Sequence, residues 1–153
     1  MQKDKDLTHS MAHILKQTLG NRATKHAFPP PVFTVMRGKF LALDVVAGTL
    51  IARFPLRKTY ENPFGTMQGG MLAAAIDNTI GPLSMLVAPE NITRTLTVTY
   101  NRPVALDQGA IVITARFISR VGRKLYFKAE VCDQQGTRLA RAKAVHWITA
   151  ATR

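Results

Sequence analysis

Residues 62–89 read NPFGTMQGGMLAAAIDNTIGPLSMLVAP, and Asp77 is the only charged side chain among these 28 residues. Burying an ionised carboxylate in apolar surroundings costs several kcal/mol unless the charge is paired. The stretch itself offers no Lys or Arg as a partner. Asp77 is therefore expected either to do chemistry or to serve as a structural acid bonded to Asn78, Thr79 or a partner chain, and the chemical role is favoured.

The same stretch predicts the longest helix of the chain, over residues 68–87. This segment is apolar on nearly all sides, which is typical of a helix at the centre of a domain, and Gly81-Pro82 is expected to weaken or kink it near its end. An earlier helix is predicted over Leu7–Leu19, where apolar residues recur at helical spacing until Gly20-Asn21. Pro29-Pro30-Pro31 then predicts a stiff extended connector.

The remaining elements are predicted to be β-strands, two before the long helix and four after it. The six runs are 40–46, 49–56, 93–100, 110–119, 125–132 and 139–149. This order predicts an α+β fold, an antiparallel sheet wrapped around a long central helix, with an extra N-terminal helix. We expect residues 1–31 to form the N-terminal helix and proline-rich connector, and residues 32–153 to form one domain.

Composition limits the partners and the compartment. Twenty-one Lys and Arg against nine Asp and Glu give a net charge of +12, which predicts an anionic partner, whether nucleic acid, a membrane surface or a phosphorylated small molecule. Cys132 is the only cysteine, no signal-peptide core is visible, and no apolar run reaches eighteen residues unbroken. We therefore expect a cytoplasmic protein. His9 and His13 have no third ligand nearby, so no metal site is expected.

Gly69 and Gly70 stand where the long helix is expected to begin. Glycine there lets a backbone N–H approach a ligand, and the helix dipole adds partial positive charge at the same place. This pattern predicts a site for a carbonyl oxygen that becomes an oxyanion, with Gly70 lining the substrate. Asp77 is the matching nucleophile or general base.

Helix geometry indicates that Gly69 and Asp77 of one chain do not act together. Eight residues of helix separate them by about 12 Å, whereas both groups must lie about 3 Å from one reacting carbonyl. A two-fold dimer, with Gly69 of one subunit facing Asp77 of the other, is the simplest solution. We therefore expect a homodimer, or a homotetramer built as a dimer of dimers, with the site shared between chains.

The pattern Asn62-(five residues)-Gln68-Gly69-Gly70-(six residues)-Asp77 resembles the helix-opening motif of hotdog-fold acyl-CoA thioesterases. The resemblance is to the PaaI-like group of the 4-hydroxybenzoyl-CoA thioesterase superfamily. It continues through residues 93–103, 120–124 and 133–136, and covers roughly Val32 to Thr149. The resemblance implies a hotdog fold and hydrolysis of acyl-CoA thioesters to free acid and CoA.

The resemblance also implies roles for individual residues. Asp77 resembles the acidic residue that attacks the thioester or activates water, and Gly69 resembles the residue whose N–H polarises the thioester carbonyl. Asn62 resembles the polar group that orients the water or the carbonyl. Thr93 resembles a Ser or Thr that helps to hold the water, with Thr95 as the alternative in register.

Two further positions concern the substrate. Gln68 stands where the family commonly has His, and Gln cannot titrate near neutrality, so the rate and the substrate class depend on this difference. Arg120, Arg123 and Lys124 lie in the turn where such enzymes often meet the phosphates of coenzyme A. Coenzyme A is part of the substrate, and no metal or redox cofactor is expected.

Other classes of function are weighed against this hypothesis. A non-catalytic hotdog module that binds acyl-CoA or another anionic ligand is the main alternative. Nucleic-acid binding lacks a recognition helix or a basic–aromatic strand motif, and neither nucleic acid nor a membrane is expected as a partner. Hotdog dehydratases need a catalytic His paired with an acid, and they rank low because no His is expected near Asp77. His146 is interpreted as packing in the last strand.

Overall fold

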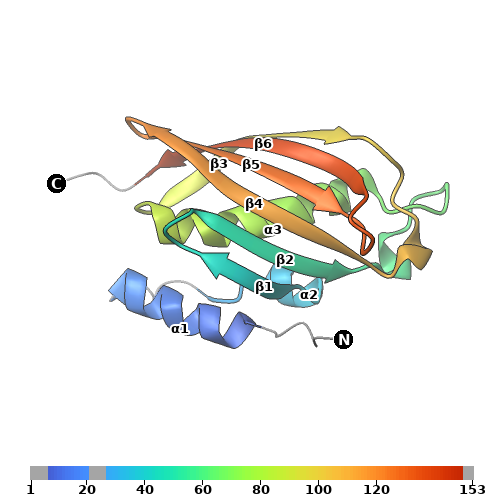
Figure 1. The fold of residues 1–153 in the computed structure, drawn as a ribbon, viewed down its shortest axis with the longest axis horizontal. Helices are drawn as coiled ribbons and strands as arrows, with labels where there is room; N and C mark the ends of the chain where they lie inside the picture. Colours follow the sequence, from blue (N-terminus) through green and yellow to red (C-terminus); the bar gives the residue numbers. More distant parts are fainter. Residues whose placement is uncertain (1–6, 21–26, 150–153) are drawn as a thin grey trace.

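A six-stranded antiparallel sheet curves around one long helix in the computed structural model, which describes residues 7–20 and 27–149 (Figure 1). The sheet order is β1-β2-β4-β5-β6-β3. The elements are α1 (Thr8–Leu19), α2 (Pro31–Val35), β1 (Lys39–Asp44), β2 (Thr49–Pro55), α3 (Gly69–Val87), β3 (Asn91–Tyr100), β4 (Ala110–Val121), β5 (Lys124–Cys132) and β6 (Arg138–Ile148), with short 3₁₀ turns at Lys58–Tyr60 and Leu106–Gln108. The predicted α+β architecture is confirmed, and each predicted strand end lies within two residues of the observed one.

The long helix α3 contributes to the core because the apolar side chains on one of its sides pack against the concave face of the sheet. Leu72, Ile76 and Ile80 are fully buried at the spacing that places side chains on one helix face. By length and a mean hydropathy of 1.3, α3 could cross a membrane, but half of that apolar stretch is buried inside this fold, as in a core helix. Pro82 lies inside the helix without ending it, and α3 continues to Val87.

Side chains of the strands alternate between the two faces of the sheet. In β5, Leu125, Phe127 and Val131 are buried, whereas Lys124 and Lys128 are exposed, as period-two geometry requires. The buried set faces α3, and the charged set faces away from it. This outer face of the sheet carries most of the exposed charge of β4, β5 and β6.

The helix α1 packs onto the domain as a covering element. Met11 and Leu15 are buried at 1% exposure each, and the backbone N–H of Leu7 donates to the carbonyl of Phe40 at 2.8 Å. The predicted N-terminal helix is confirmed over the described part. Residues 1–6 and 21–26 of the predicted N-terminal segment, and 150–153 of the predicted domain, lie outside the described residues.

One short helix was not predicted. The proline run was expected to remain extended, but Pro31 begins α2 instead, because the φ angle of proline suits the first position of a helix. The helix buries Phe33, whose ring stacks on Phe40 at 4.3 Å between centroids and meets Phe54 edge-on at 5.5 Å. Burial of this ring explains why the chain turns into a helix here.

The strand β3 forms one edge of the sheet. It pairs with β6 along one side, and no other described strand pairs with its second side. Ile92 and Tyr100, near its two ends, are 50% and 51% exposed. A ten-residue edge strand with exposed apolar side chains offers a surface that a second chain can extend.

Candidate active site

Asp77 lies near the middle of α3, on the side that the sheet leaves uncovered. This side is a row of partly or fully accessible residues at three- and four-residue spacing, which we call the open stripe: Gly70, Ala74, Asp77, Gly81 and Met85. Within the described residues, neither of the ion pairs involves Asp77. A carboxylate without a cationic partner thus faces the surface beside β3.

The hydroxyl of Thr93 is the group that holds this carboxylate. Thr93 Oγ1 donates a hydrogen bond to Asp77 Oδ1 at 3.0 Å. Two residues that the sequence resemblance assigned to one site are therefore in contact. A hydroxyl beside an uncompensated carboxylate can also hold a water molecule in line with it.

A β-bulge decides which threonine reaches Asp77. The pairing of β3 with β6 skips one position between Thr93 and Thr95, so Arg94 is the extra residue. Without the bulge, Thr93 and Thr95 would lie on the same face of the sheet. With it, Thr93 faces α3 and Thr95 pairs with Val145 on the outer face. In this geometry Thr93, and not Thr95, contacts Asp77.

His146 joins the site from β6. Its Nε2 lies 3.3 Å from Thr93 Oγ1, and its Nδ1 lies 2.8 Å from Asn91 Oδ1. The side chain is 2% exposed, and its ring lies 4.9 Å from that of Phe127. The expectation that His146 packs is correct, but the expectation that no His lies near Asp77 was wrong, because strand pairing places His146 directly opposite Thr93.

Part of this contact could have been predicted. The period-two pattern of residues 139–148 puts His146 on the buried face together with Ala142 and Ala144. A buried His needs hydrogen-bond partners, so a polar neighbour on an adjacent strand was to be expected. The register that makes Thr93 this neighbour has no local signal in either strand.

Asn91 determines which ring nitrogen of His146 carries the proton. The amide nitrogen of Asn91 donates to the carbonyls of Ser84 and Pro89, at 3.2 and 2.8 Å. The amide oxygen therefore faces the ring and accepts from Nδ1–H. In a neutral ring, Nε2 is then a proton acceptor, so the single hydroxyl proton of Thr93 has two possible acceptors, Nε2 and Asp77.

Burial favours this neutral ring. Desolvation lowers the pKa of His146 below its ordinary value of 6.5, although the nearby carboxylate of Asp77 acts in the opposite direction. Asp77 from α3 is the charged group that acts on the ring. The neighbours from β3 and β5, including Asn91, Thr93 and Phe127, carry no charge.

Gly69 is the first residue of α3, and Gln68 is its N-cap with an exposed side chain that makes no capping bond. The N–H groups of the first helical turn have no intrahelical acceptors. Tyr100, which sequence analysis did not single out, donates from its hydroxyl to the Gly69 carbonyl at 2.8 Å. A methyl group at Gly69 would meet the ring and hydroxyl of Tyr100 at 3.3 Å, whereas one at Gly70 would meet no atom within 4 Å.

Two separate hollows border these groups. One, of about 340 Å³, is lined by Gly69, Tyr100 and the segment from Asn101 to Val104. The other, of about 310 Å³, is lined by Asp77, Thr93, His146 and Pro30, among others. Gly69 and Asp77 of one chain therefore border different hollows. This separation agrees with the distance of eight helical residues between them.

Asn62 is engaged within its own loop. Its amide nitrogen donates to Thr66 Oγ1 at 2.9 Å, and its amide oxygen accepts from the N–H groups of Phe64 and Thr66 at 2.9 and 3.1 Å. These bonds shape the turn that leads into α3. The observed contacts of Asn62 are therefore those of a residue that positions the start of the helix.

The predicted basic residues lie at the hairpin between β4 and β5. Arg123 donates from two nitrogens to the carbonyl of Ile148, at 3.0 and 2.8 Å, and Arg120 donates to the carbonyl of Gly122 at 2.9 Å. Lys124 lies over the ring of Trp147. Because Leu125 pairs with His146, this hairpin lies at the same end of the sheet as Asp77 and Thr93.

Comparisons with known proteins agree with this arrangement. Residues 64–140 match the family model of the thioesterase superfamily. Among solved structures, a phenylacetic acid degradation-related protein of Ralstonia eutropha is 25% identical, with a TM-score of 0.74 over 88% of this chain and 98% of that one. The PaaI protein of the E. coli phenylacetic acid degradation operon is 15% identical, with a TM-score of 0.75 over 93% and 98%.

A third similar structure is a Streptococcus mutans protein solved with bound acetyl-CoA, 18% identical with a TM-score of 0.72 over 84% of this chain and 99% of that one. A search of curated proteins gave no match. The family model covers half of the chain, and the sheet, the central helix and the N-terminal helix match the hotdog neighbours. The chain therefore belongs to the thioesterase superfamily, and its structure is the hotdog fold of PaaI-like thioesterases.

Proposed function

We propose that two copies of this chain together hydrolyse acyl-CoA thioesters to the free acid and CoA, with Asp77 as the general base. The observation that carries this proposal is the contact between Thr93 and Asp77 on the open stripe. It presents a carboxylate without a cationic partner beside a hydroxyl that can hold water. Membership of the thioesterase superfamily supports the reaction class.

The positions of Gly69 and Asp77, which we call the two half-sites, support a site shared between subunits. Gly69 and Asp77 border different hollows, and the open stripe of α3 runs beside the unpaired edge of β3. Ala73 lies midway between Gly69 and Asp77 in the helix. A two-fold axis near Ala73 would therefore bring Gly69 of each α3 opposite Asp77 of the other, because two-fold contacts are reciprocal.

The hydrolysis requires one proton to move from water to sulfur. Asp77 accepts a proton from water as the water oxygen bonds to the carbonyl carbon of the thioester. The charge that develops on the carbonyl oxygen meets the N–H of Gly69 of the partner subunit, at the positive end of its helix. The carbon–sulfur bond then breaks, and the sulfur leaves with the electron pair and takes the proton from Asp77. The steps balance without a metal or a redox cofactor.

Thr93 and His146 keep the carboxylate and the water in position in this scheme. When Asp77 is ionised, Thr93 donates its hydroxyl proton to the carboxylate. When Asp77 holds the proton taken from water, the Thr93 hydroxyl can turn to Nε2 of the neutral His146 ring, which Asn91 holds in place. Both ring nitrogens of His146 are engaged, by Thr93 and by Asn91, so we assign His146 the role of positioning Thr93, which differs from that of a dehydratase histidine.

The coenzyme A part of the substrate would meet the basic hairpin at the same end of the sheet. Arg120 and Lys124 are exposed there, and guanidinium and ammonium groups bind phosphates through charge-assisted hydrogen bonds. Arg123 already donates to the carbonyl of Ile148. We therefore assign Arg123 a structural role in the hairpin and not direct contact with coenzyme A. The S. mutans protein with acetyl-CoA and a Streptococcus pneumoniae protein with coenzyme A support a ligand of this class.

A panel of short, medium, long and aromatic acyl-CoAs, read through a dye for the released thiol, tests the proposal. The full chain should release CoA, and Asp77→Asn should lower kcat by about 10²- to 10⁴-fold, the usual contribution of a general base. Asp107→Asn makes the same change at an exposed turn residue and should leave kcat unchanged. Equal activity of Asp77→Asn and the parent chain would remove Asp77 from the mechanism.

Binding of acyl-CoA without hydrolysis is the competing function. The exposed side chain of Gln68, where the resemblance suggests His, is the observation that favours it. Under this alternative, calorimetry would detect acyl-CoA binding in both the parent chain and Asp77→Asn, while no member of the panel would release thiol.

A further inference from the structure

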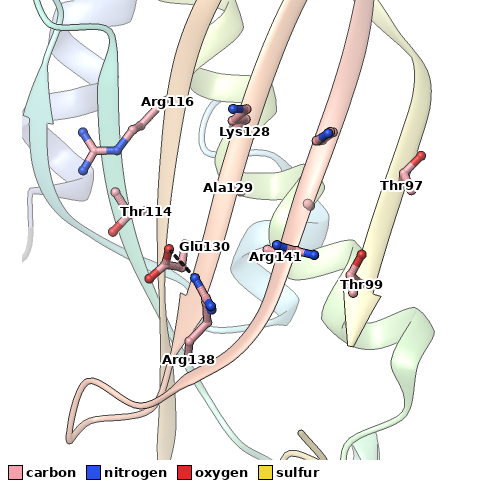
Figure 2. A pocket seen from close by; sticks show the side chains of 11 residues that line it. Thr97, Thr99, Thr114, Arg116, Lys128, Ala129, Glu130, Arg138 and Arg141 are labelled. Atoms are coloured by element: carbon pink, nitrogen blue, oxygen red, sulfur yellow. Dashed lines mark ion pairs between the residues drawn. The ribbon is translucent and has the colours of Figure 1, made fainter. Parts of the chain in front are cut away.

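A hollow of about 490 Å³ opens on the outer face of the sheet, away from α3 (Figure 2). Side chains from β3, β4, β5 and β6 line it. Five of them are cationic: Arg116, Lys128, Arg138, Arg141 and Lys143. The thioesterase chemistry proposed for Asp77 of α3 makes no use of these residues.

Strand register places three of the cations in one row. Arg116 of β4 pairs with Lys128 of β5, and Lys128 pairs with Lys143 of β6. Neighbouring strands lie about 4.8 Å apart, and like charges directly opposite one another destabilise a sheet. The fold therefore carries an unfavourable arrangement that a bound anion would relieve.

The hollow contains little negative charge of its own. Of the described residues that line it, Glu130 alone carries a carboxylate, and it pairs with Arg138 at 3.8 Å. Neither ion pair among the described residues neutralises Arg116, Lys128, Arg141 or Lys143. All four side chains belong to exposed residues, so they are available to a ligand.

We propose that this hollow binds a linear condensed phosphate, of which tripolyphosphate is the simplest probe. The hydroxyl groups of Thr97, Thr99 and Thr114 also line it, and they can donate to phosphate oxygens between the cations. Its volume lies in the usual range for small-ligand sites. Charge complementarity selects an anion with several negative groups in a row, because the cations themselves form a row.

The chemistry of the lining disfavours other occupants. Among the described residues no aromatic ring lines the hollow, whereas sites for single-stranded nucleic acid use rings on which bases stack. A flat membrane surface would contact exposed side chains around the hollow more readily than those inside it. A second copy of this chain would bring the same cations against one another, which electrostatic repulsion opposes.

Calorimetry on the full chain with tripolyphosphate, orthophosphate, an oligothymidylate and phosphatidylserine vesicles tests the proposal. Tripolyphosphate should bind saturably and more weakly as salt rises. Lys128→Gln and Lys143→Gln should each weaken this binding by about tenfold, equivalent to 1.4 kcal/mol. Lys16→Gln, which removes an equal charge from the exposed surface of α1, should leave it unchanged. Neither sheet variant should alter thioester hydrolysis, which separates this site from the one at Asp77.

Three outcomes would overturn the proposal. Absence of saturable tripolyphosphate binding is the first, and an equal loss in Lys16→Gln and Lys128→Gln, which would mean attraction by net charge alone, is the second. Tighter binding of the oligothymidylate or of the vesicles than of tripolyphosphate is the third, and it would assign the face to nucleic acid or to membrane.

Thermal unfolding gives an independent readout that a folding defect cannot imitate. At low salt and without ligand, Lys128→Gln should raise the melting temperature, because it removes the central charge of the row. The same variant should lose most of the rise that tripolyphosphate causes in the parent chain. A variant that melts lower without ligand and keeps the full ligand-induced rise would contradict the proposal.

Discussion

The hydroxyl of Thr93 lies 3.3 Å from Nε2 of the buried His146 ring and donates to Asp77 at 3.0 Å. One hydroxyl therefore connects a carboxylate on the central helix with an imidazole on the neighbouring strand β6. Asn91 holds the ring of His146 in place through Nδ1. The Thr93 hydroxyl therefore lies between two fixed groups, the Asp77 carboxylate and Nε2 of His146. Four experiments follow from this connection and from the half-site at Gly69.

Removal of the Thr93 hydroxyl should impair catalysis while the fold is kept. Hydrogen bonds to charged groups contribute about 1.5–3 kcal/mol, so Thr93→Val should lower kcat by roughly 10- to 100-fold. Thr93→Ser keeps the hydroxyl and should retain most of the activity. Steady-state kinetics with the best acyl-CoA of the panel measure both, and equal losses in Val and Ser variants would point to packing instead of the hydroxyl.

His146 should make the stability of the folded chain dependent on pH. Its pKa is lowered in the folded state, so on acidification the unfolded chain takes up this proton first, near pH 6.5. The unfolded state then binds more protons, and the free energy of unfolding should fall as the pH drops below 6.5. Denaturant unfolding between pH 5 and pH 8 measures this slope.

His146→Gln should flatten that slope, although the variant is expected to be less stable at every pH because it loses a buried ring. His13→Gln, at an exposed position of α1, should keep the slope of the parent chain. Parallel slopes for the parent chain and His146→Gln would show that other groups cause the pH dependence.

Mixing two inactive variants tests the shared site. Gly69→Val and Asp77→Asn damage different half-sites, so a mixed dimer retains one intact site of its two. Random pairing makes half of the dimers mixed, and about a quarter of the parent activity should therefore return after co-expression. If each chain holds its own complete site, mixed dimers contain no intact site and the activity stays at background.

The two glycines that open α3 should respond differently to a methyl group. Gly69→Ala presses against the Tyr100 ring at 3.3 Å and disturbs the bond from Tyr100 to the Gly69 carbonyl. The displaced N–H of residue 69 should then lower kcat by at least about tenfold. Gly70→Ala meets open space and should raise the free energy of unfolding by about 0.5–1 kcal/mol. Kinetics and thermal unfolding of both variants check this, and similar behaviour of the two would contradict the role of Tyr100.

Local periodicity explains why most of the fold was predictable. Strands such as β5 alternate buried and exposed residues, and α3 is apolar over most of its nineteen residues, so the pattern of each element lies within its own segment. The short helix α2 was missed because its cause, burial of Phe33 between Phe40 and Phe54, lies in strands further along the chain. A proline run alone does not reveal such a contact.

The candidate site divides in the same way. An unpaired charge in an apolar helix and a glycine pair at its start are visible in the order of the residues, and so Asp77 and Gly69 could be singled out from the sequence alone. His146 could not be assigned, because its partner depends on the register between β3 and β6 and on the extra residue Arg94. Register results from the pairing of whole strands, and a shift of one residue would have turned Thr93 away from the carboxylate.

The amount of positive charge can be predicted from the sequence, but its location cannot. The excess of Lys and Arg, which predicts an anionic partner, is set by composition. Where that charge gathers depends on folding, since Arg116, Lys128 and Lys143 lie apart in sequence and become neighbours through the pairing of β4, β5 and β6. Residue order thus specified the elements and the isolated carboxylate of Asp77, while hydrogen bonding between strands assembled the Asp77–Thr93–His146 contact and the row of cations.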